Sequence, residues 1–306
     1  MTEETAESTV KPLIGLTMGD PRGVSAEVGR VGLLKLGGLA RWVAYAPDGY
    51  FGADLDHLDL IYRPPAQAQP VRDAIERSAV ELADGTIDGV VTGPVDKQVF
   101  TGDFPGHTEL YAARCGVSDE DVAMWMAGPR LNVVPVTRHV ALADVPSLLN
   151  ARAVTKAGVL VGRAVTQSLG RPARIAVAGL NPHAGDGGLF GDEEARILAP
   201  AVANMCAAGI DATGPHSPDT VFTQALAGRF DAVVCGYHDQ GLIPFKLIHF
   251  SDGVNVTLGL PRPRTSPDHG PAFDIAGRGV ADANSMIHAM RLAIALSAGD
   301  PPKDTF

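Results

Sequence analysis

Three histidines stand where chemistry is expected, each just after a short apolar run and close to a glycine or an aspartate. They are His139, His183 and His238. Three imidazoles can bind one divalent metal ion and leave a coordination position for a substrate. They could equally be separate hydrogen-bonded loop residues, because none forms a local pair such as H-E-x-x-H. Asp239 follows His238 directly and could orient it, relay a proton or make a structural hydrogen bond.

A second group of candidates is cationic. Lys97, Lys246 and Arg264 occur in segments rich in glycine and proline, and we expect them in turns rather than on solvated helix faces. Arginine can hold a phosphate or carboxylate through two parallel hydrogen bonds, whereas lysine supplies a point charge. Surface salt bridges are the alternative, and the sequence does not separate the two. His107 and Thr108, in another polar segment, could contact a substrate.

The glycine-rich stretch 185–191 precedes a helix that we expect to begin near Asp192. It could hold a ligand at the helix N-terminus, or it could be a tight loop capped by Asp192. The chain has no Walker A sequence, no G-x-G-x-x-G between a strand and a helix, and no G-x-S-x-G. A conventional dinucleotide fold and a serine hydrolase are therefore both unsupported.

The bulk composition narrows the class of protein. The 306 residues carry a net charge of −10, which argues against a nucleic-acid-binding surface but leaves room for a local anion site. Three widely spaced cysteines form no C-x-x-C pair, which is typical of a reducing cytoplasm, and Cys235 is expected to be a buried thiol. No apolar run is long enough to cross a membrane, and the N-terminus does not resemble a signal peptide. We expect a cytoplasmic protein with no membrane or nucleic-acid partner.

Short apolar runs rich in valine and isoleucine alternate with segments of helical periodicity. The runs suit strands buried on both faces, and the alternation predicts an α/β protein with a mostly parallel sheet. Polar clusters follow the runs, so we expect them to meet beyond the carboxyl ends of the strands in one composite site. The expected strands are 13–17, 87–92, 131–137, 175–180 and 232–235, and the clearest helices are 71–82, 154–169 and 285–296.

Seven short motifs are spread along the chain: Gly19-Asp-Pro-Arg-Gly23, Thr92-Gly-Pro-Val-Asp-Lys97, Gly106-His-Thr-Glu109, Asn181-Pro-His-Ala-Gly185, Pro218-Asp-Thr220, Tyr237-His-Asp-Gln-Gly241 and Arg264-Thr-Ser266. Together they resemble one family, the PdxA family of 4-hydroxythreonine-4-phosphate dehydrogenases, over nearly the whole chain from Gly15 to Leu296. A further segment, 269–279, resembles the nucleotide loop of isopropylmalate and isocitrate dehydrogenases, which bind NAD(P) without a Rossmann fingerprint.

The resemblance implies a fold of two α/β/α domains with an interdomain cleft, like that of isopropylmalate and isocitrate dehydrogenases. We expect residues 1–128 together with about 261–306 in the first domain and about 129–260 in the second. It also implies a homodimer with a shared active site, in which His139 and His183 of one copy and His238 of the other bind a divalent metal (Zn, Mg or Co). The implied substrate-binding residues are His107, Thr108, Lys246, Asn255 and Arg264, the implied catalytic residues are the three histidines and Asp239, and those implied for NAD or NADP are His269, Gly270, Ala272 and Asp274.

The implied reaction is oxidation of 4-phosphooxy-L-threonine at C3, followed by loss of CO₂ to give 3-amino-2-oxopropyl phosphate, in pyridoxal 5'-phosphate biosynthesis. The alternative is a related dehydrogenase acting on 4-phospho-D-threonate or 4-phospho-D-erythronate, small phosphorylated hydroxy acids of sugar-acid catabolism. Two departures from the family pattern are expected to matter, the first for the geometry of a loop and the second for the affinity for the cofactor. Gly23-Val-Ser-Ala-Glu27 lacks a usual glycine and proline, and Pro271 replaces a usual threonine or serine, with loss of a hydroxyl and a backbone donor.

Overall fold

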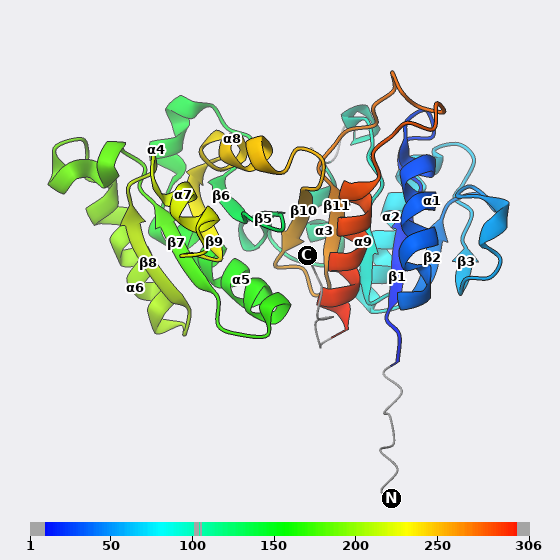
Figure 1. Ribbon diagram of the computed structural model, residues 1–306, viewed down its shortest axis with the longest axis horizontal. Coiled ribbons are helices and arrows are strands. Elements are labelled where there is room, and N and C mark those ends of the chain that lie inside the picture. The colour runs from blue at the N-terminus through cyan, green and yellow to red at the C-terminus, as the bar shows by residue number, and fades with distance from the viewer. Residues whose placement is uncertain (1–9, 101–103, 105, 299–306) are drawn as a thin grey trace, which may run out of the picture.

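The computed structural model describes residues 10–100, 104 and 106–298, and their strands form a single mixed sheet (Figure 1). The order of the strands across the sheet is β3-β2-β1-β4-β11-β10-β5-β6-β9-β7-β8. Their bounds are β1 Leu13–Thr17, β2 Arg41–Tyr45, β3 Leu60–Tyr62, β4 Gly89–Val91, β5 Ala123–Ala127, β6 Val133–Thr137, β7 Arg174–Ala178, β8 Asp211–His216, β9 Ala232–Tyr237, β10 Val254–Leu258 and β11 Arg264–Pro267.

Both ends of the sheet are parallel, and its centre is antiparallel. Strands β3, β2, β1, β4 and β11 run parallel at one end, as do β6, β9, β7 and β8 at the other. The pairs β11–β10, β10–β5 and β5–β6 are antiparallel. A short connection joins β5 to β6, and two strands joined so closely can pair only in opposite directions. The expected α/β class is confirmed, with this antiparallel centre added.

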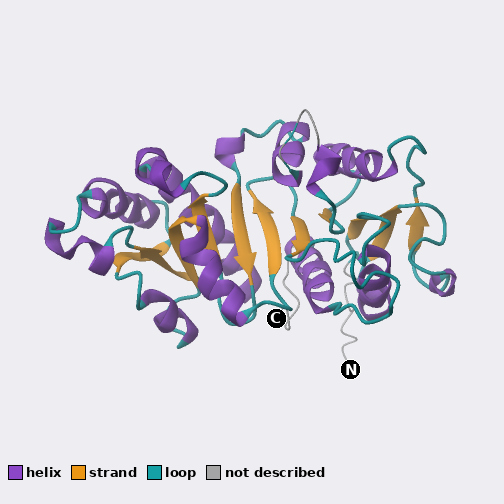
Figure 2. Cartoon of the chain, turned by 90° about the horizontal axis from the view of Figure 1, so that it is seen from above, coloured by secondary structure: helices purple, strands orange, loops and turns teal. Residues whose placement is uncertain are grey.

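The expected strands are buried on both faces because helices cover both sides of the sheet (Figure 2). Alternate residues of one strand face different cores. Val133 and Val233 pack with α8, whereas Val134 and Val234 face the main core, to which α5 contributes. The helices are α1 Ser25–Leu36, α2 Pro70–Asp84, α3 His107–Arg114, α4 Val145–Leu148, α5 Ala151–Leu169, α6 Ala199–Ala207, α7 Val221–Leu226, α8 His238–Ile248 and α9 Asn284–Ser297.

The three helices expected from periodicity correspond to α2, α5 and α9, within one to three residues at each end. Helices α2 and α5 both end at a glycine in the left-handed conformation, Gly85 (φ 84°) and Gly170 (φ 64°). Glycine terminates helices in this way because it adopts positive φ without a steric penalty. The N-terminus of α5 is capped by Asn150, whose Oδ1 accepts a hydrogen bond from the backbone N–H of Ala153.

The chain passes between β5 and β6 at residues 128–132 and between α8 and β10 at residues 249–253, and one side chain joins the two connections. The buried His249 Nε2 accepts hydrogen bonds from the backbone N–H groups of Arg130 (3.3 Å) and Leu131 (3.2 Å). Its Nδ1 lies 2.9 Å from Asp252 Oδ1. An Nε2 that accepts two bonds must be unprotonated, so Nδ1 carries the proton and donates to the carboxylate. A Cβ on Gly128 would lie 2.6 Å from the His249 ring.

Cys235 is fully buried, as expected, and burial raises the pKa of its thiol. Within the part of the chain that the structure describes, no helix is long and apolar enough to cross a membrane. The expected domain limits stay a prediction. Strand β10, which was expected in the second domain, lies in the sheet between β11 and β5, which were both expected in the first.

Candidate active site

A buried cation stands at the centre of the candidate site. Arg264, which is only 3% exposed, lies at the start of β11, so the expectation that it occupies a turn is wrong. Its Nη1 donates to Thr257 Oγ1 (3.3 Å), its Nη2 donates to Thr92 Oγ1 (2.5 Å), and its Cζ lies 6.0 Å from the centre of the Tyr111 ring. Its buried Nε has no hydrogen-bond partner, and no carboxylate of the described residues forms an ion pair with it.

Burial lowers the pKa of Arg264 to about 10, against smaller opposing effects of Tyr111 and Glu109. The guanidinium is therefore still charged at neutral pH. A buried charge without a counter-ion is costly, and a ligand carboxylate or phosphate would compensate it. Arginine is suited to both anions because its donors form a planar fork. The arrangement therefore supports an anion-binding role for Arg264.

His107 and Thr108 lie beside this cation, in the first turn of α3. The buried His107 Nε2 has no partner among the described residues, and the ring packs edge-on against Phe100 at 4.8 Å. Burial, and secondarily the charge of Arg264, holds the pKa of His107 well below its usual 6.5, so the imidazole is neutral. Thr108 Oγ1 lies 3.5 Å from Thr257 Oγ1, which joins α3 to the strand beside Arg264.

Asn255 and Lys246 belong to the same region. Asn255 lies two residues from Thr257 on β10 and so points to the same face of the sheet; its buried Oδ1 has no partner among the described residues. Lys246 lies near the end of α8, not in a turn as the sequence suggested. Its Nζ lies 2.9 Å from Asp268 Oδ2, just beyond β11. This ion pair links the helix that begins at His238 to the strand that carries Arg264.

Of the three expected metal ligands, the structure brings two together. His139 follows β6 and His238 begins α8 after β9, and because these strands are parallel neighbours the two rings meet with their centres 5.6 Å apart. That separation suits two imidazoles on one ion with metal–nitrogen distances of about 2.1 Å. His238 Nδ1 lies 2.6 Å from Asp239 Oδ1, an arrangement in which a carboxylate orients a ligand imidazole.

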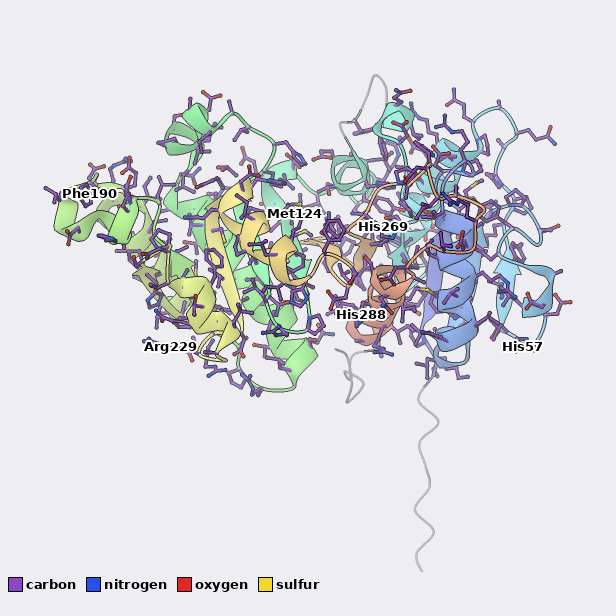
Figure 3. All side chains as sticks on the ribbon, turned by 45° about the horizontal axis from the view of Figure 1, so that its top comes forward. His57, Met124, Phe190, Arg229, His269 and His288 are labelled. Carbon is purple, nitrogen blue, oxygen red and sulfur yellow. The ribbon has the colours of Figure 1, made fainter. Side chains whose placement is uncertain are left out.

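His183 does not join them. Its ring centre lies 6.5 Å from that of Phe190, which Figure 3 shows at the outer end of the molecule. Among the described residues, no three His, Cys, Asp or Glu side chains are grouped closely enough to hold a metal ion. A site built from all three histidines therefore cannot form within one chain in this arrangement.

The loop that carries His183 has an unusual backbone. Residues 183–187 all have positive φ, including His183 (53°), Ala184 (57°) and Asp186 (44°). Residues other than glycine rarely adopt this conformation, and such strain is typical of functional sites. The buried Glu194 holds the loop: its Oε1 accepts from the N–H groups of Leu180 (2.9 Å) and Asn181 (2.8 Å), and its Oε2 accepts from Asn181 Nδ2 (3.0 Å).

The sequence did not single out Glu194, nor Gln240, which ties the loop to α8. Gln240 Oε1 accepts from the N–H of Gly236 (2.7 Å), and its Nε2 donates to the carbonyl of Gly179 (2.8 Å). Of the two alternatives for the glycine-rich stretch, a cap at Asp192 is not formed: the helical segment begins at Glu194, and no side chain of the described residues caps its N-terminus. Asp192 instead forms an ion pair with Arg196 (3.3 Å).

The expected nucleotide loop follows β11 and packs on the start of α1. The carbonyl of Pro271 accepts from the N–H of Val24 (2.9 Å), and Arg22 Cζ lies 5.0 Å from the centre of the Phe273 ring. Ala272 has φ 49°, and a Cβ on Gly23 would lie 2.5 Å from the Pro271 carbonyl oxygen. Of the expected cofactor residues, His269 is half-buried, with Nδ1 2.8 Å from the Gly270 carbonyl, and Asp274 is exposed.

The altered segment after Gly23 is accommodated by two glycines. The Ser25 hydroxyl is fully buried, has no partner among the described residues, and is the group that a Cβ on Gly19 or Gly93 would meet, at 2.3 and 2.4 Å respectively. Helix α1 nevertheless begins at Ser25.

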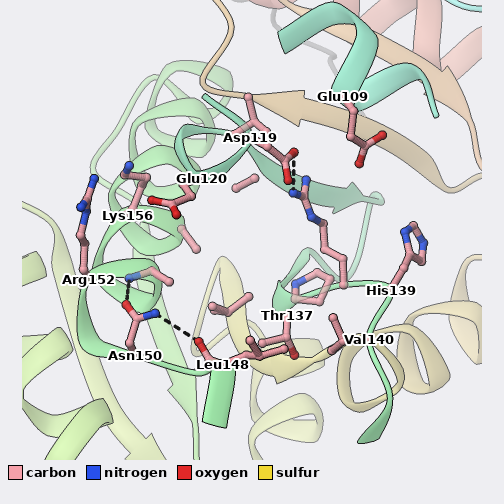
Figure 4. Close-up of a pocket in the computed structure, with 17 residues that line it drawn as sticks. Glu109, Asp119, Glu120, Thr137, His139, Val140, Leu148, Asn150, Arg152 and Lys156 are labelled. Carbon is pink, nitrogen blue, oxygen red and sulfur yellow. Dashed lines mark hydrogen bonds and ion pairs between the residues drawn. The ribbon is translucent and has the colours of Figure 1, made fainter. Parts of the chain in front are cut away.

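A cavity of about 720 Å³ is lined by His139, by the neighbouring residues of the loop after β6, and by Glu109, but not by Arg264, His107 or Lys246. Figure 4 shows Glu109 and His139 toward the right of the view, Asp119 near its top centre and Glu120 farther to the left. Asp119 forms an ion pair with Arg138 (3.0 Å), whereas Glu109 has no hydrogen bond or ion pair with another described residue. The cavity therefore brings the loop after β6 and the first turn of α3 to one space.

The α/β fold resembles that of a β-decarboxylating dehydrogenase from Thermococcus kodakarensis, which superposes with a TM-score of 0.60 at 16% identity, over 95% of this chain and 84% of that one. The family model described as pyridoxal phosphate biosynthetic protein PdxA matches residues 60–293, and the chain belongs to this family. It is 45% identical to a 4-hydroxythreonine-4-phosphate dehydrogenase from Desulfosudis oleivorans, over 93% of this chain and 96% of that protein. The crystal structure of the Klebsiella pneumoniae 4-hydroxythreonine-4-phosphate dehydrogenase superposes with a TM-score of 0.77 at 36% identity, covering 95% of this chain and 99% of that one.

Proposed function

We propose that the protein is an NAD(P)-dependent 4-hydroxythreonine-4-phosphate dehydrogenase of pyridoxal 5'-phosphate biosynthesis. It would oxidise 4-phosphooxy-L-threonine to 2-amino-3-oxo-4-phosphooxybutanoate, which loses CO₂ to give 3-amino-2-oxopropyl phosphate. The observation that carries this proposal is the buried Arg264 guanidinium, without a carboxylate partner among the described residues, beside a neutral His107, in a chain of the PdxA family. The substrate carries two anionic groups that a guanidinium can bind.

Each candidate side chain has a role that its surroundings support. Arg264 binds a substrate anion, and Lys246, already 2.9 Å from Asp268, supplies a second positive charge at the other side of the site. The neutral His107 and the hydroxyl of Thr108 bind the phosphate or the neighbouring hydroxyl, and Asn255 orients the anion. In the ketone product, the carbonyl adjacent to the carboxylate-bearing carbon accepts the electrons released as CO₂ leaves.

The residues present fit a divalent metal ion only if two copies of the chain contribute. His139 and His238 already have a spacing that suits one ion, and His183 of a second copy would complete a set of three imidazoles. This pairing of His139 with His238 differs from the pairing that the family resemblance implies, in which His238 comes from the partner. A divalent ion bound there would supply Lewis acidity toward the C3 hydroxyl. Asp239 would keep the His238 ring oriented by holding its Nδ1 proton.

The nicotinamide cofactor supplies the hydride acceptor, and we propose that it binds along the loop from His269 to Asp274. The contacts of this loop with α1 support a fixed position for it. The carbonyl of Pro271 takes part in those contacts by accepting from the N–H of Val24. Titration of the protein with NAD and with NADP, and comparison of the two dissociation constants, would show which cofactor it prefers.

A homodimer is part of the proposal because α8 presents an apolar stripe. Ile243 and Leu247, one turn apart on α8, and Phe250, two residues beyond its end, are 60%, 81% and 82% exposed. Exposed apolar patches of this kind are typical of interfaces. A second copy seated on α8 would lie beside His238 and Lys246, which the same helix carries. Sedimentation of Leu247→Asp, expected to be monomeric, tests this.

Two further points belong to the proposal. We place the protein in the cytoplasm, because its cysteines are sparse and unpaired. We also propose the two-domain division, with residues 1–128 and about 261–306 in one domain and about 129–260 in the other. The connection at residues 128–132 supports the first boundary, whereas the connection at residues 249–253 lies before the proposed second boundary, with β10 between them.

The test is NADH or NADPH formation with 4-phosphooxy-L-threonine, with 4-phospho-D-threonate and 4-phospho-D-erythronate run in parallel, each with added Zn²⁺, Mg²⁺ or Co²⁺ and after chelation. Metal-dependent turnover that favours the amino acid is expected. A preference for either hydroxy acid would assign the protein to sugar-acid catabolism instead. Turnover that survives thorough chelation would exclude the proposed metal site.

A further inference from the structure

Glu109 is a carboxylate beside the cationic Arg264 and the neutral His107. It is the third residue of α3, directly after His107 and Thr108, and its charge raises the pKa of Arg264 against the larger effect of burial. It also lines the cavity that His139 lines, and Figure 4 shows both side chains at the same side of that cavity. Glu109 is therefore close to both the anion-binding group and the histidine group.

The carboxylate of Glu109 is half-buried and forms no hydrogen bond or ion pair with another described residue. The other acidic side chains of the cavity are different. Asp119 is paired with Arg138, and Glu120 lies beside Asp119, away from His139 (Figure 4). A carboxylate near a site for phosphate and carboxylate groups repels the substrate unless it meets a positive charge. Glu109 consequently points to a cationic group on the ligand.

We propose that Glu109 binds the ammonium group at C2 of the substrate and thereby selects the amino acid over the corresponding hydroxy acid. This inference rests on the proposed function. The C3 hydroxyl belongs at the histidines and an anionic end of the substrate at Arg264, so the C2 substituent lies close to both groups, as Glu109 does. An ammonium donates charge-assisted hydrogen bonds to a carboxylate, whereas a hydroxyl brings no charge to offset the carboxylate's desolvation.

A purely structural role for Glu109 makes a different prediction. An acidic residue in the first turn of a helix interacts favourably with the helix dipole, and Glu at the third position can bond back to the N-cap N–H. Loss of such a contribution would loosen α3 and weaken His107 and Thr108. The kcat/KM values for the amino acid and for the hydroxy acid would then fall by the same factor. The ratio of the two activities therefore separates recognition from structural support.

The experiment compares wild type with Glu109→Gln, which keeps the shape and removes the charge, and with Glu120→Gln as the matched control from the same cavity. The kcat/KM values for 4-phosphooxy-L-threonine and 4-phospho-D-threonate are measured with each protein. In Glu109→Gln we expect kcat/KM for the amino acid to fall about 10- to 100-fold, with the hydroxy acid changed less than about threefold. Glu120→Gln should leave both values within about twofold of wild type.

Equal losses on both substrates, or no loss on the amino acid, would overturn the assignment of Glu109. Glu109→Asp, which retains the charge, provides a check on folding: it should keep a preference for the amino acid even if its overall activity is reduced. Loss of that preference in a folded Glu109→Asp would also contradict the proposal. A wild-type protein that oxidises neither substrate would instead overturn the proposed function itself, and with it this inference.

Discussion

Replacing Glu194 with alanine is expected to destabilise the protein and to remove activity, although Glu194 touches none of the groups proposed to bind substrate. The side chain is 6% exposed and accepts three hydrogen bonds, from Leu180 N, Asn181 N and Asn181 Nδ2. These bonds hold the start of the loop in which residues 183–187 adopt positive φ. Without them the loop has little to offset its backbone strain.

The size of the effect follows from the three bonds. A hydrogen bond to a charged group contributes about 1.5–3 kcal/mol, so simple addition gives about 4.5–9 kcal/mol. Water can reach part of the half-buried Asn181, and neighbouring bonds are not additive. We therefore expect a loss of about 3–5 kcal/mol for Glu194→Ala. Glu194→Gln keeps an oxygen at the Oε1 position, where two of the bonds converge, and should lose only about 1–2 kcal/mol.

Urea unfolding of wild type and both variants, followed by circular dichroism with the m-value fitted separately, measures these differences. Proteolysis of the folded variants should show new cleavage within 183–191 in Glu194→Ala only. A loss below about 1.5 kcal/mol in Glu194→Ala, or equal losses in the two variants, would refute the view that this carboxylate organises the loop.

Three further predictions concern single side chains. His183→Ala should abolish metal-dependent turnover, and because His183 is exposed the free energy of unfolding should change by less than about 1 kcal/mol; near-normal activity would exclude the metal assignment. Burial, and then the nearby guanidinium, holds the pKa of His107 well below 6.5, so on acidification the unfolded chain binds a proton that the folded chain does not. Wild type should therefore lose up to about 1.4 kcal/mol of stability per pH unit relative to His107→Gln as the pH falls below 6.5, and parallel stability profiles would contradict this. Burial raises the pKa of the Cys235 thiol, so a thiol reagent should modify exposed Cys206 first, half-buried Cys115 slowly and Cys235 only after unfolding; rapid reaction of Cys235 in the native protein would show that its strand opens.

Much of the fold could be predicted from the sequence because short apolar runs and helical stripes are local signals. The run 13–17 coincides with β1, and the periodic segment 154–169 lies within α5. The antiparallel centre of the sheet could not be predicted in the same way. Strand direction depends on which partner each strand finds, and β10 lies between β5 and β11, which are distant in sequence from one another.

The candidate site shows the same division between local and non-local information. Residue type and motif context singled out Arg264 and His107, but nothing local showed that Arg264 lies on a strand or that its Nη2 donates to Thr92. Glu194 was missed because a glutamate in the first turn of a helical segment normally lies in solvent and only interacts with the helix dipole. Its burial against Asn181 arises from the folded loop.

The hydrogen bonds of His249 affect how the two halves of the sheet can move relative to one another. The chain enters the strands β6, β7, β8 and β9 through residues 128–132 and leaves them, after α8, through residues 249–253. His249 belongs to the second connection and accepts hydrogen bonds from the first. Because His249 joins the two connections, any swing of these strands about the rest of the molecule would move both connections together. Next to these connections, β5 and β6 share only the register pair Met126–Val133 among the described residues. The ladder of backbone hydrogen bonds is therefore short at this point of the sheet. Because α8 ends directly before His249, a small rotation of β6, β7, β8 and β9 about these connections would move His238 and Lys246 together, as parts of one rigid helix.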